Sequence, residues 1–262
     1  MKVILYGSEN WIGKLFIEFL KDYSDIECVP GTGSFENTFT LEDHIIEVSP
    51  THIISFIDSE SDILYENILD NLYSPLILAD LCKKMNIHYT YIGTGCIFNL
   101  GINYDFDESS LPSNFDTNYS IIKGFTDRLM KNYSNSSLNL RIHAPMSSML
   151  NSTEFIKRVN TYDKLINITV LDDFFPIFLD LMRNKRRGTY NCTNPGTITH
   201  HELMKSYRDL VDPEFEIICN NNFIGEPFIN NLLIQSWYPA IKSAKKSIVN
   251  VLLKLKKNIS LL

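Results

Sequence analysis

Tyr119 and Lys123 stand four positions apart, a spacing that could support proton transfer. Residues i and i+4 of an α-helix lie on the same face, so the two side chains would be neighbours. An ammonium group beside a phenol favours the phenolate and lowers the pKa of the phenol from about 10. A tyrosine in that setting can exchange a proton near neutral pH. The spacing alone is not specific, because Tyr238 and Lys242 repeat it further along the chain.

A threonine placed 25 residues before Tyr119 makes the pair more specific. Thr94 lies in the stretch GTGCIF, which follows the apolar run IHYTYI that predicts a strand. In a parallel sheet, ligands bind beyond the carboxyl ends of the strands. Thr94 and Cys96 are therefore candidates to face a ligand. The alternative is a glycine turn with a buried cysteine.

The N-terminal stretch VILYGSENWIGKLF predicts a strand, a turn and a helix. Gly7 and Gly13 match the outer glycines of a nucleotide-binding turn that reads G-x-x-G-x-x-G, but Asn10 takes the middle place. The backbone N–H groups of such a turn and of the helix N-terminus bind pyrophosphate. Asparagine tolerates positive φ better than most side chains, so we expect Asn10 to keep the turn and to add an amide donor. This turn, with Trp11 and Ile12, is the candidate cofactor site; an ordinary tight turn is the alternative.

Strands and helices alternate through the first half of the chain and less regularly after Pro145. Apolar runs predict strands at 2–7, 26–30, 51–57, 87–93, 138–145 and 188–194. Helical periodicity predicts helices at 11–23, 40–50 (with Thr40 as N-cap), 66–86, 119–133, 152–165, 170–187 and 198–210. The alternation predicts an α/β fold: a doubly wound parallel sheet of the Rossmann type with a small C-terminal substrate lobe.

We expect the dinucleotide-binding domain to span 1–147 plus 167–196, and the substrate lobe to span 148–166 plus 197–262. Within the lobe, the stretch at 242–258 is basic and amphipathic. We interpret it as a solvated final helix; a membrane or partner surface is the alternative.

Composition argues against several classes of protein. The 262 residues carry a net charge of −7, which argues against nucleic acid as the main partner. No apolar run approaches the roughly 18 residues of a membrane span, and the N-terminus lacks the apolar region of a signal peptide. Five cysteines show neither C-x-x-C nor a His/Cys spacing typical of a metal site. We expect a cytoplasmic protein that has no metal and no membrane partner.

Thr94, Tyr119 and Lys123 behind a dinucleotide turn form the pattern of short-chain dehydrogenases/reductases. More closely, the chain resembles the bifunctional 3,5-epimerase/4-reductases of rhamnose synthesis, known from plants and giant viruses. The matching stretches run in order over residues 1–215 and read YGSENWIG, DNLYSPLILADLC, GTGCIF, YSIIKGFTDRLMKNY, LNLRIHAP, VLDDFFP and GTYNCTNPGTITHHELM.

The resemblance implies a role for each matching residue. Tyr119 would protonate oxygen 4 of a 4-keto sugar while the nicotinamide delivers hydride to carbon 4, and Thr94 would hold the same oxygen. Lys123 would bind the nicotinamide ribose and tune Tyr119, and Asn71 would support the lysine through water. Cys96 would act as acid or base for ring inversion, because protons at carbons 3 and 5 lie next to the ketone and their removal gives an enolate at oxygen 4.

Departures from the family pattern bear on specificity. The second epimerase residue of the family is a lysine in F-I-x-K, and here Arg158 takes that place with Lys157 one position early. Arginine is a poor proton donor because its pKa exceeds about 12, so either Lys157 does this work or Arg158 only stabilises charge. One centre or two could therefore be inverted. Ser34 stands where relatives hold the extra phosphate of NADPH with arginine, yet no acid ends that strand. We therefore expect NADPH rather than NADH, with Lys14 as a further phosphate partner.

Taken with the resemblance, these residues predict an NADPH-dependent epimerase/4-reductase acting on a UDP- or dTDP-linked 4-keto-6-deoxyhexose, with hydroxyl or acetamido at carbon 2. Relatives often pair through the helices that contain Asn71 and Tyr119, which implies a homodimer. The main alternative is a non-catalytic NADP-binding regulatory subunit, favoured by Asn10, by Ser34 and by Pro227 and Phe228 in place of a family arginine. A 4,6-dehydratase would carry an Asp-Glu pair after the active-site threonine, which is absent here. His143 either faces the nicotinamide or fills a strand end.

Overall fold

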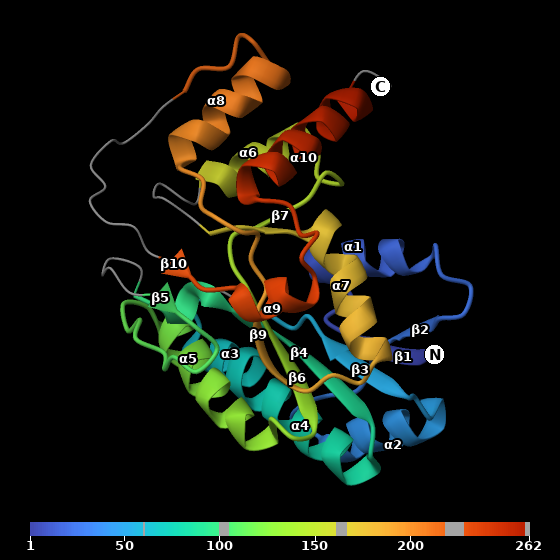
Figure 1. Cartoon of the computed structure of the whole chain (residues 1–262). Helices are drawn as coiled ribbons and strands as arrows, with labels where there is room; N and C mark the ends of the chain where they lie inside the picture. Colours follow the sequence, from blue (N-terminus) through green and yellow to red (C-terminus); the bar gives the residue numbers. More distant parts are fainter. Residues whose placement is uncertain (60, 100–104, 161–166, 218–227, 260–262) are drawn as a thin grey trace. The chain divides into compact units, whose positions relative to one another are not determined.

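The computed structural model describes residues 1–59, 61–99, 105–160, 167–217 and 228–259 (Figure 1). Its strands are β1 (Lys2–Tyr6), β2 (Glu27–Pro30), β3 (His52–Ser55), β4 (His88–Thr94), β5 (Asp105–Phe106), β6 (Ser137–Ile142), β7 (Pro145–Met146), β8 (Thr169–Val170), β9 (Gly188–Asn191) and β10 (Phe228–Ile229). Its α-helices are α1 (Trp11–Leu20), α2 (Thr38–Val48), α3 (Leu64–Ile68), α4 (Ser74–Met85), α5 (Asn118–Met130), α6 (Ser152–Asn160), α7 (Leu171–Arg183), α8 (His200–Leu210), α9 (Leu232–Trp237) and α10 (Ala244–Ile259). Shorter turns are the π turn η1 (Leu69–Tyr73) and the 3₁₀ turns η2 (Gly95–Ile97) and η3 (Lys131–Tyr133).

The predicted sheet is confirmed: six strands lie in the order β2-β1-β3-β4-β6-β9. β1 pairs in parallel with both β2 and β3, and β3 pairs in parallel with β4. The late strand β9, predicted as a strand at 188–194, lies at the edge of this sheet. The strand order reverses between β1 and β3, and ligands of open α/β sheets bind at such a switch point. Gly7, Asp58 and Thr94 follow or end β1, β3 and β4 at this carboxyl edge.

The chain forms two compact units, which are described separately. The first unit comprises Met1–Phe98, Leu111–Arg141 and Phe178–Tyr190. The second comprises Asn99–Ser110, Ile142–Ile177 and Asn191–Leu262.

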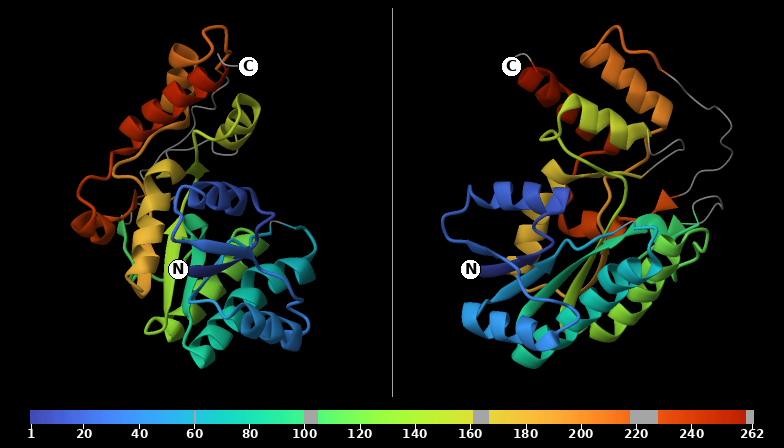
Figure 2. Two further views of the ribbon diagram at one scale, coloured as in Figure 1. Left: turned by 90° about the vertical axis from the view of Figure 1, so that its right-hand side faces the viewer. Right: turned by 180° about the vertical axis from the view of Figure 1, so that it is seen from behind.

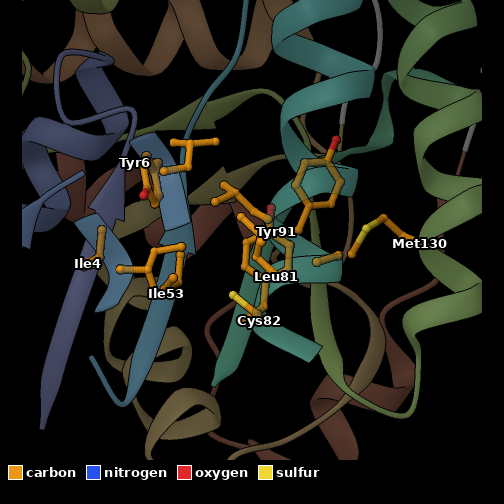
Figure 3. Close-up of a cluster of buried hydrophobic side chains, with 12 residues drawn as sticks. Ile4, Tyr6, Ile53, Leu81, Cys82, Tyr91 and Met130 are labelled. Atoms are coloured by element: carbon orange, nitrogen blue, oxygen red, sulfur yellow. The ribbon is translucent and has the colours of Figure 1, made fainter. Parts of the chain in front are cut away.

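Strands β1 and β3 lie in the interior of the sheet and are almost wholly buried, which explains why they are mainly apolar. α2, α4 and α5 lie together on one side of the strands in both views of Figure 2, and their side chains close a cluster with alternate residues of the sheet (Figure 3). The buried members of this cluster are Ile4, Tyr6, Leu41, Ile45, Ile53, Leu78, Ala79, Leu81, Cys82, Tyr89, Tyr91 and Met130. Full burial of one large aliphatic side chain stabilises a fold by about 1.5–3 kcal/mol.

The second unit is organised around α6, α8 and α10. α8 packs against both other helices, and α10 also packs on β8. The basic C-terminal stretch thus forms a helix with one face buried, through Ile248, Val251, Leu252 and Leu255. The apolar positions 248, 251, 252 and 255 recur at helical spacing, which leaves the lysines on the outer face. Among the residues that the structure describes, no helix is both long and apolar enough to cross a membrane.

Two predicted helices differ from the structure for reasons that the local contacts explain. α2 begins at Thr38 with Asn37 as N-cap, whose side chain accepts a hydrogen bond from the Phe39 N–H, so Thr40 is not the cap as predicted. The predicted helix 66–86 is divided into α3, η1 and α4. Pro75 lacks an N–H to donate to the carbonyl of Asn71, so a regular α-helix cannot continue through this turn.

Candidate functional site

Two glycines shape the turn after β1. Gly7 adopts φ +77°, and a Cβ atom there would lie 2.5 Å from the backbone carbon of Phe56. A Cβ atom on Gly13 would lie 2.3 Å from the carbonyl oxygen of Gly7. Positive φ and close backbone approach each require glycine. The spacing Gly7 to Gly13 therefore brings the first turn of α1 directly against the end of β1.

Asn10 caps α1, and its backbone is not in the positive-φ region that the sequence argument assigned to it. Its φ and ψ are −62° and 142°, and its side-chain Oδ1 accepts a hydrogen bond of 2.9 Å from the Ile12 N–H. An asparagine N-cap stabilises a helix by about 1 kcal/mol relative to alanine. The amide oxygen thus points at the N-terminus of α1. Trp11 and Ile12 form the first turn of this helix, where the helix dipole favours an anion.

The other predicted phosphate contacts lie on the surface of the first unit. Lys14 forms an ion pair with Glu9, with 3.1 Å between Nζ and Oε2, and both side chains are exposed. Ser34 is exposed in the turn between β2 and α2, where its hydroxyl accepts a hydrogen bond from the Glu36 N–H.

Thr94 and Cys96 lie half-exposed at the carboxyl end of β4. The Cys96 N–H donates a hydrogen bond of 3.1 Å to the Thr94 hydroxyl oxygen, which caps η2. The side-chain amide of Asn114 donates a hydrogen bond of 2.9 Å to the Cys96 carbonyl. A hydroxyl has one donor and two acceptor positions, so Thr94 keeps its O–H for donation while its oxygen is fixed by the turn.

The helix α5 carries Tyr119 and Lys123 on one face, as predicted from their spacing. Its N-terminus is fixed by a capping box between Thr117 and Ser120. The Lys123 ammonium lies 5.7 Å from the centre of the Tyr119 ring. Both side chains bind the same carboxylate: Lys123 Nζ lies 2.8 Å from Asp58 Oδ1, and the Tyr119 hydroxyl donates to Oδ1 at 3.2 Å.

Lys123 is buried but charged. Burial alone would lower the pKa of its ammonium, but Asp58 and Tyr91 outweigh burial and raise that pKa. Nζ donates to the Tyr91 hydroxyl at 3.4 Å, inside the sheet core. The positive charge expected beside Tyr119 is therefore present. The same ammonium is also paired with the Asp58 carboxylate.

Asn71 is the predicted support of Lys123. It is buried in the π turn η1, and its side chain forms hydrogen bonds with the loop after β3. Its side-chain Nδ2 donates to the Ser59 carbonyl at 2.6 Å, and its Oδ1 accepts from the Ser59 N–H at 3.3 Å. Its own carbonyl accepts a hydrogen bond of 2.5 Å from the Thr126 hydroxyl of α5. π turns often occur at functional sites, and this one joins the Asp58 loop to the helix that carries Tyr119.

Comparison with known proteins places the chain in a family. No family model matches it. It is 35% identical to the uncharacterised protein L780 of Acanthamoeba polyphaga mimivirus, over 98% of this chain and 99% of that protein. It is 30% identical to a bifunctional dTDP-4-dehydrorhamnose 3,5-epimerase/dTDP-4-dehydrorhamnose reductase of Arabidopsis thaliana, over 94% of this chain and 90% of that protein. The chain belongs to this epimerase/reductase family.

Solved structures agree with this family and with the fold. The crystal structure of the L780 UDP-rhamnose synthase from the same mimivirus matches 97% of this chain and 99% of its own, with a TM-score of 0.88 at 33% identity. A dTDP-4-dehydrorhamnose reductase from Bacillus anthracis, crystallised in complex with NADP, has a TM-score of 0.79 at 17% identity and covers 97% of this chain and 98% of its own. This second likeness concerns the fold alone. The predicted resemblance to plant and giant-virus epimerase/reductases is confirmed.

The remaining predicted residues lie in the second unit. Lys157 and Arg158 are on α6, where Lys157 is exposed and Arg158 is half-buried. His143, which follows β6, is buried, and its burial lowers the pKa of the imidazole to about 4. It is therefore neutral at pH 7. Phe228 opens β10, and Pro227 lies outside the described residues.

Sequence reasoning missed Asp58, although it binds both Tyr119 and Lys123. Asp58 is 61 positions from Tyr119, so no local spacing connects them. One signal was available: an acidic residue soon after an apolar strand, at the edge where a parallel sheet meets its ligands.

Proposed function

We propose that this epimerase/reductase family member converts a UDP- or dTDP-linked 4-keto-6-deoxyhexose into a rhamnose-type 6-deoxy-L-sugar nucleotide, using NADPH. The observation that carries the proposal is the convergence of Tyr119 and Lys123 at the carboxyl edge of the sheet. Thr94 ends β4 at the same edge, and Cys96 lies in the turn η2 that follows it. A proton donor, a hydroxyl donor and a thiol are the groups that ketone reduction with epimerisation needs.

The first unit suits a dinucleotide. The backbone at Gly7 and Gly13, capped by Asn10, presents the α1 N-terminus for pyrophosphate. No carboxylate occurs at 31–35, directly after β2, where NAD enzymes place an acid for the ribose hydroxyls. Ser34 and Lys14 would hold the extra phosphate of NADPH. When bound, NADPH supplies the hydride that reduces carbon 4.

The proposed reduction needs one proton at oxygen 4. Tyr119 gives its hydroxyl proton to this oxygen, and the O–H of Thr94 donates a hydrogen bond to the same atom. Lys123, charged and buried, stabilises the phenolate that Tyr119 becomes. Solvent then returns the proton to Tyr119.

The proposed epimerisation precedes reduction and uses Cys96 as base. The thiolate removes a proton from carbon 3 or carbon 5, and the electron pair moves to oxygen 4 as an enolate that Thr94 and Tyr119 stabilise. A proton returned to the opposite ring face inverts the carbon. The family resemblance favours Lys157 as the donor for this return; the alternative is that Arg158 takes that place and only stabilises charge.

Turnover in heavy water tests this function and its substrate. The protein is mixed with NADPH and, separately, with the UDP and dTDP forms of 4-keto-6-deoxyglucose and with the 2-acetamido UDP counterpart. We expect NADPH oxidation together with deuterium at carbon 3, carbon 5 or both, as read by NMR. In Cys96→Ser, deuterium incorporation is expected to be lost. The fastest substrate identifies the nucleotide and the carbon-2 group.

The opposite result would favour a non-catalytic role. If NADPH binds but none of the three sugars is reduced, the enzyme proposal fails. The alternative is then a regulatory NADP-binding subunit, and Asn10, which caps the Ile12 N–H, is the departure that supports it.

The proposed enzyme pairs with a second copy through α3, η1 and α5. α3 and η1 pack against α5, yet Phe125 (53%), Leu129 (41%) and Ile68 (38%) remain exposed on these elements. Exposed apolar groups of this kind mark protein interfaces. We expect the wild type to have the mass of two chains by light scattering and Phe125→Glu to have that of one. Leu253→Glu, an equally exposed leucine of α10, should leave the mass unchanged; a monomeric wild type would contradict the pairing.

A further inference from the structure

One carboxylate binds both catalytic candidates of α5. Asp58 follows β3, and its Oδ1 lies 2.8 Å from Lys123 Nζ. The Tyr119 hydroxyl donates to Oδ1 at 3.2 Å and to Oδ2 at 3.4 Å. The Lys123 side chain is 2% exposed and that of Asp58 is 38% exposed. Asp58 is thus the more exposed partner of this ion pair in the three-residue cluster.

The position of Asp58 is fixed by its neighbour. The backbone of Ser59 is held at both its N–H and its carbonyl by the buried side chain of Asn71. Asn71 in turn donates to Asn67 Oδ1 at 2.8 Å. These contacts hold the backbone of Ser59, the residue next to Asp58, against η1.

The carboxylate opposes ionisation of Tyr119. The hydrogen bond from Tyr119 to Asp58 exists only while the phenol keeps its proton, and a phenolate would face a negative charge at about the same distance. The Lys123 ammonium has the opposite effect, because it favours the phenolate. Within the described part of the chain, the further charged or titratable groups that face this cluster include Tyr91 of β4, which binds Lys123, and Asp70 of η1, which interacts with both Lys123 and Asp58.

We propose that Asp58 is a positioning residue that keeps Tyr119 protonated and aligned for donation, offsetting the effect of Lys123. The assignment rests on the proposed function for its catalytic meaning. Reduction of a ketone consumes the proton of Tyr119, so the resting enzyme needs the phenol rather than the phenolate. A carboxylate that accepts from the hydroxyl holds this state until the substrate oxygen replaces it as acceptor.

Titration of Tyr119 in the protein without cofactor or substrate tests this. Tyrosine labelled with ¹³C at the ring carbon that bears oxygen reports ionisation by NMR, and loss of one signal in Tyr119→Phe assigns the residue. In Asp58→Asn, which keeps size and hydrogen-bonding capacity, the midpoint of the Tyr119 titration should fall by about 1 pH unit or more. Identical Tyr119 shifts in both proteins, at every pH where both are folded, would overturn the proposal.

A matched control separates this effect from loss of any surface charge. Glu36 also accepts a hydrogen bond from a tyrosine hydroxyl, that of Tyr65 rather than Tyr119. Glu36→Gln should leave the Tyr119 titration unchanged; an equal shift in this variant would contradict a local role for Asp58. Where turnover is found, the basic limb of the kcat–pH profile should move with the Tyr119 midpoint in Asp58→Asn. The NMR titration needs no turnover. The effect of Asp58 on Tyr119 can therefore be measured even if the proposed function fails.

Discussion

Replacement of Tyr119 by phenylalanine is expected to lower kcat for ketone reduction by a factor of about 10² to 10⁴, the usual contribution of a positioned general acid. The phenylalanine ring keeps the contact with Lys123, whose ammonium lies 5.7 Å from the ring centre. The lost hydroxyl binds a carboxylate that is partly exposed. Removal of such a bond changes stability little, so the loss should lie in kcat and not in folding.

The measurement combines steady-state NADPH oxidation with a titration of NADPH binding by fluorescence. Binding should persist within a few-fold in Tyr119→Phe, because the role proposed for the hydroxyl is at the reacting oxygen and not at the cofactor. Tyr65→Phe is the matched control, since Tyr65 is a more exposed tyrosine whose hydroxyl also donates to a carboxylate. A Tyr119→Phe enzyme with more than about a tenth of wild-type kcat would show that another group protonates oxygen 4.

The glycine turn shows which features of the site the local sequence can predict. The stretch VILYGSENWIGKLF predicted a strand, a turn and a helix, with Gly7 and Gly13 in the turn. The structure gives the reason for both glycines: φ is +77° at Gly7, and the backbone approaches Gly13 too closely for a Cβ atom. The conformation of Asn10 was wrongly predicted. Asparagine suits both the left-handed region and an N-cap, and only the structure shows that its side chain caps Ile12.

The predicted helix 66–86 is divided for a reason that the spacing of its apolar residues cannot show. The apolar spacing continues through Pro75, but the missing N–H leaves the Asn71 carbonyl without its helical donor. Thr126 of α5 supplies a hydroxyl instead. The proline was visible in the sequence; the partner that compensates for it, 55 positions away, was not.

Asp58 marks the limit of prediction for the site. Tyr119 and Lys123 are joined by helix geometry and could be paired from sequence. Asp58 reaches them only because β3 and β4 are neighbours in the sheet and α5 packs on β4. Contacts that depend on strand order require the topology, and the sequence pattern predicts the presence of a parallel sheet without its full order.

A buried ion pair secures the helix that carries Tyr119 and Lys123. Arg141 of β6 donates from Nε to Asp127 Oδ1 at 2.9 Å and from Nη2 to Oδ2 at 2.7 Å. Both side chains are nearly inaccessible, at 0% and 4% exposure, and Asn139 also donates to Oδ1. The Arg141 guanidinium lies 5.3 Å from the ring centre of Phe98, just after Cys96. The pair thus ties α5 to β6 and supports the turn that holds Thr94 and Cys96.

Arg141→Met is expected to lower the free energy of unfolding by about 3–5 kcal/mol, because it leaves the Asp127 carboxylate buried without a counter-charge. Arg141→Met combined with Asp127→Asn removes that charge and keeps an acceptor for Asn139, so it should lose clearly less than the single variant. Urea unfolding at pH 7 measures the free energy of unfolding of both variants.

Arg183→Met is the control. Arg183 also forms two hydrogen bonds with a carboxylate, that of Asp25, but on the surface. Its replacement should lower the free energy of unfolding by under about 1 kcal/mol. Equal losses for Arg141→Met and Arg183→Met would show that burial of the Arg141 pair does not determine its contribution. If the single and double variants lost equal free energy of unfolding, the destabilisation would come from lost packing of the arginine and not from the unpaired Asp127 carboxylate.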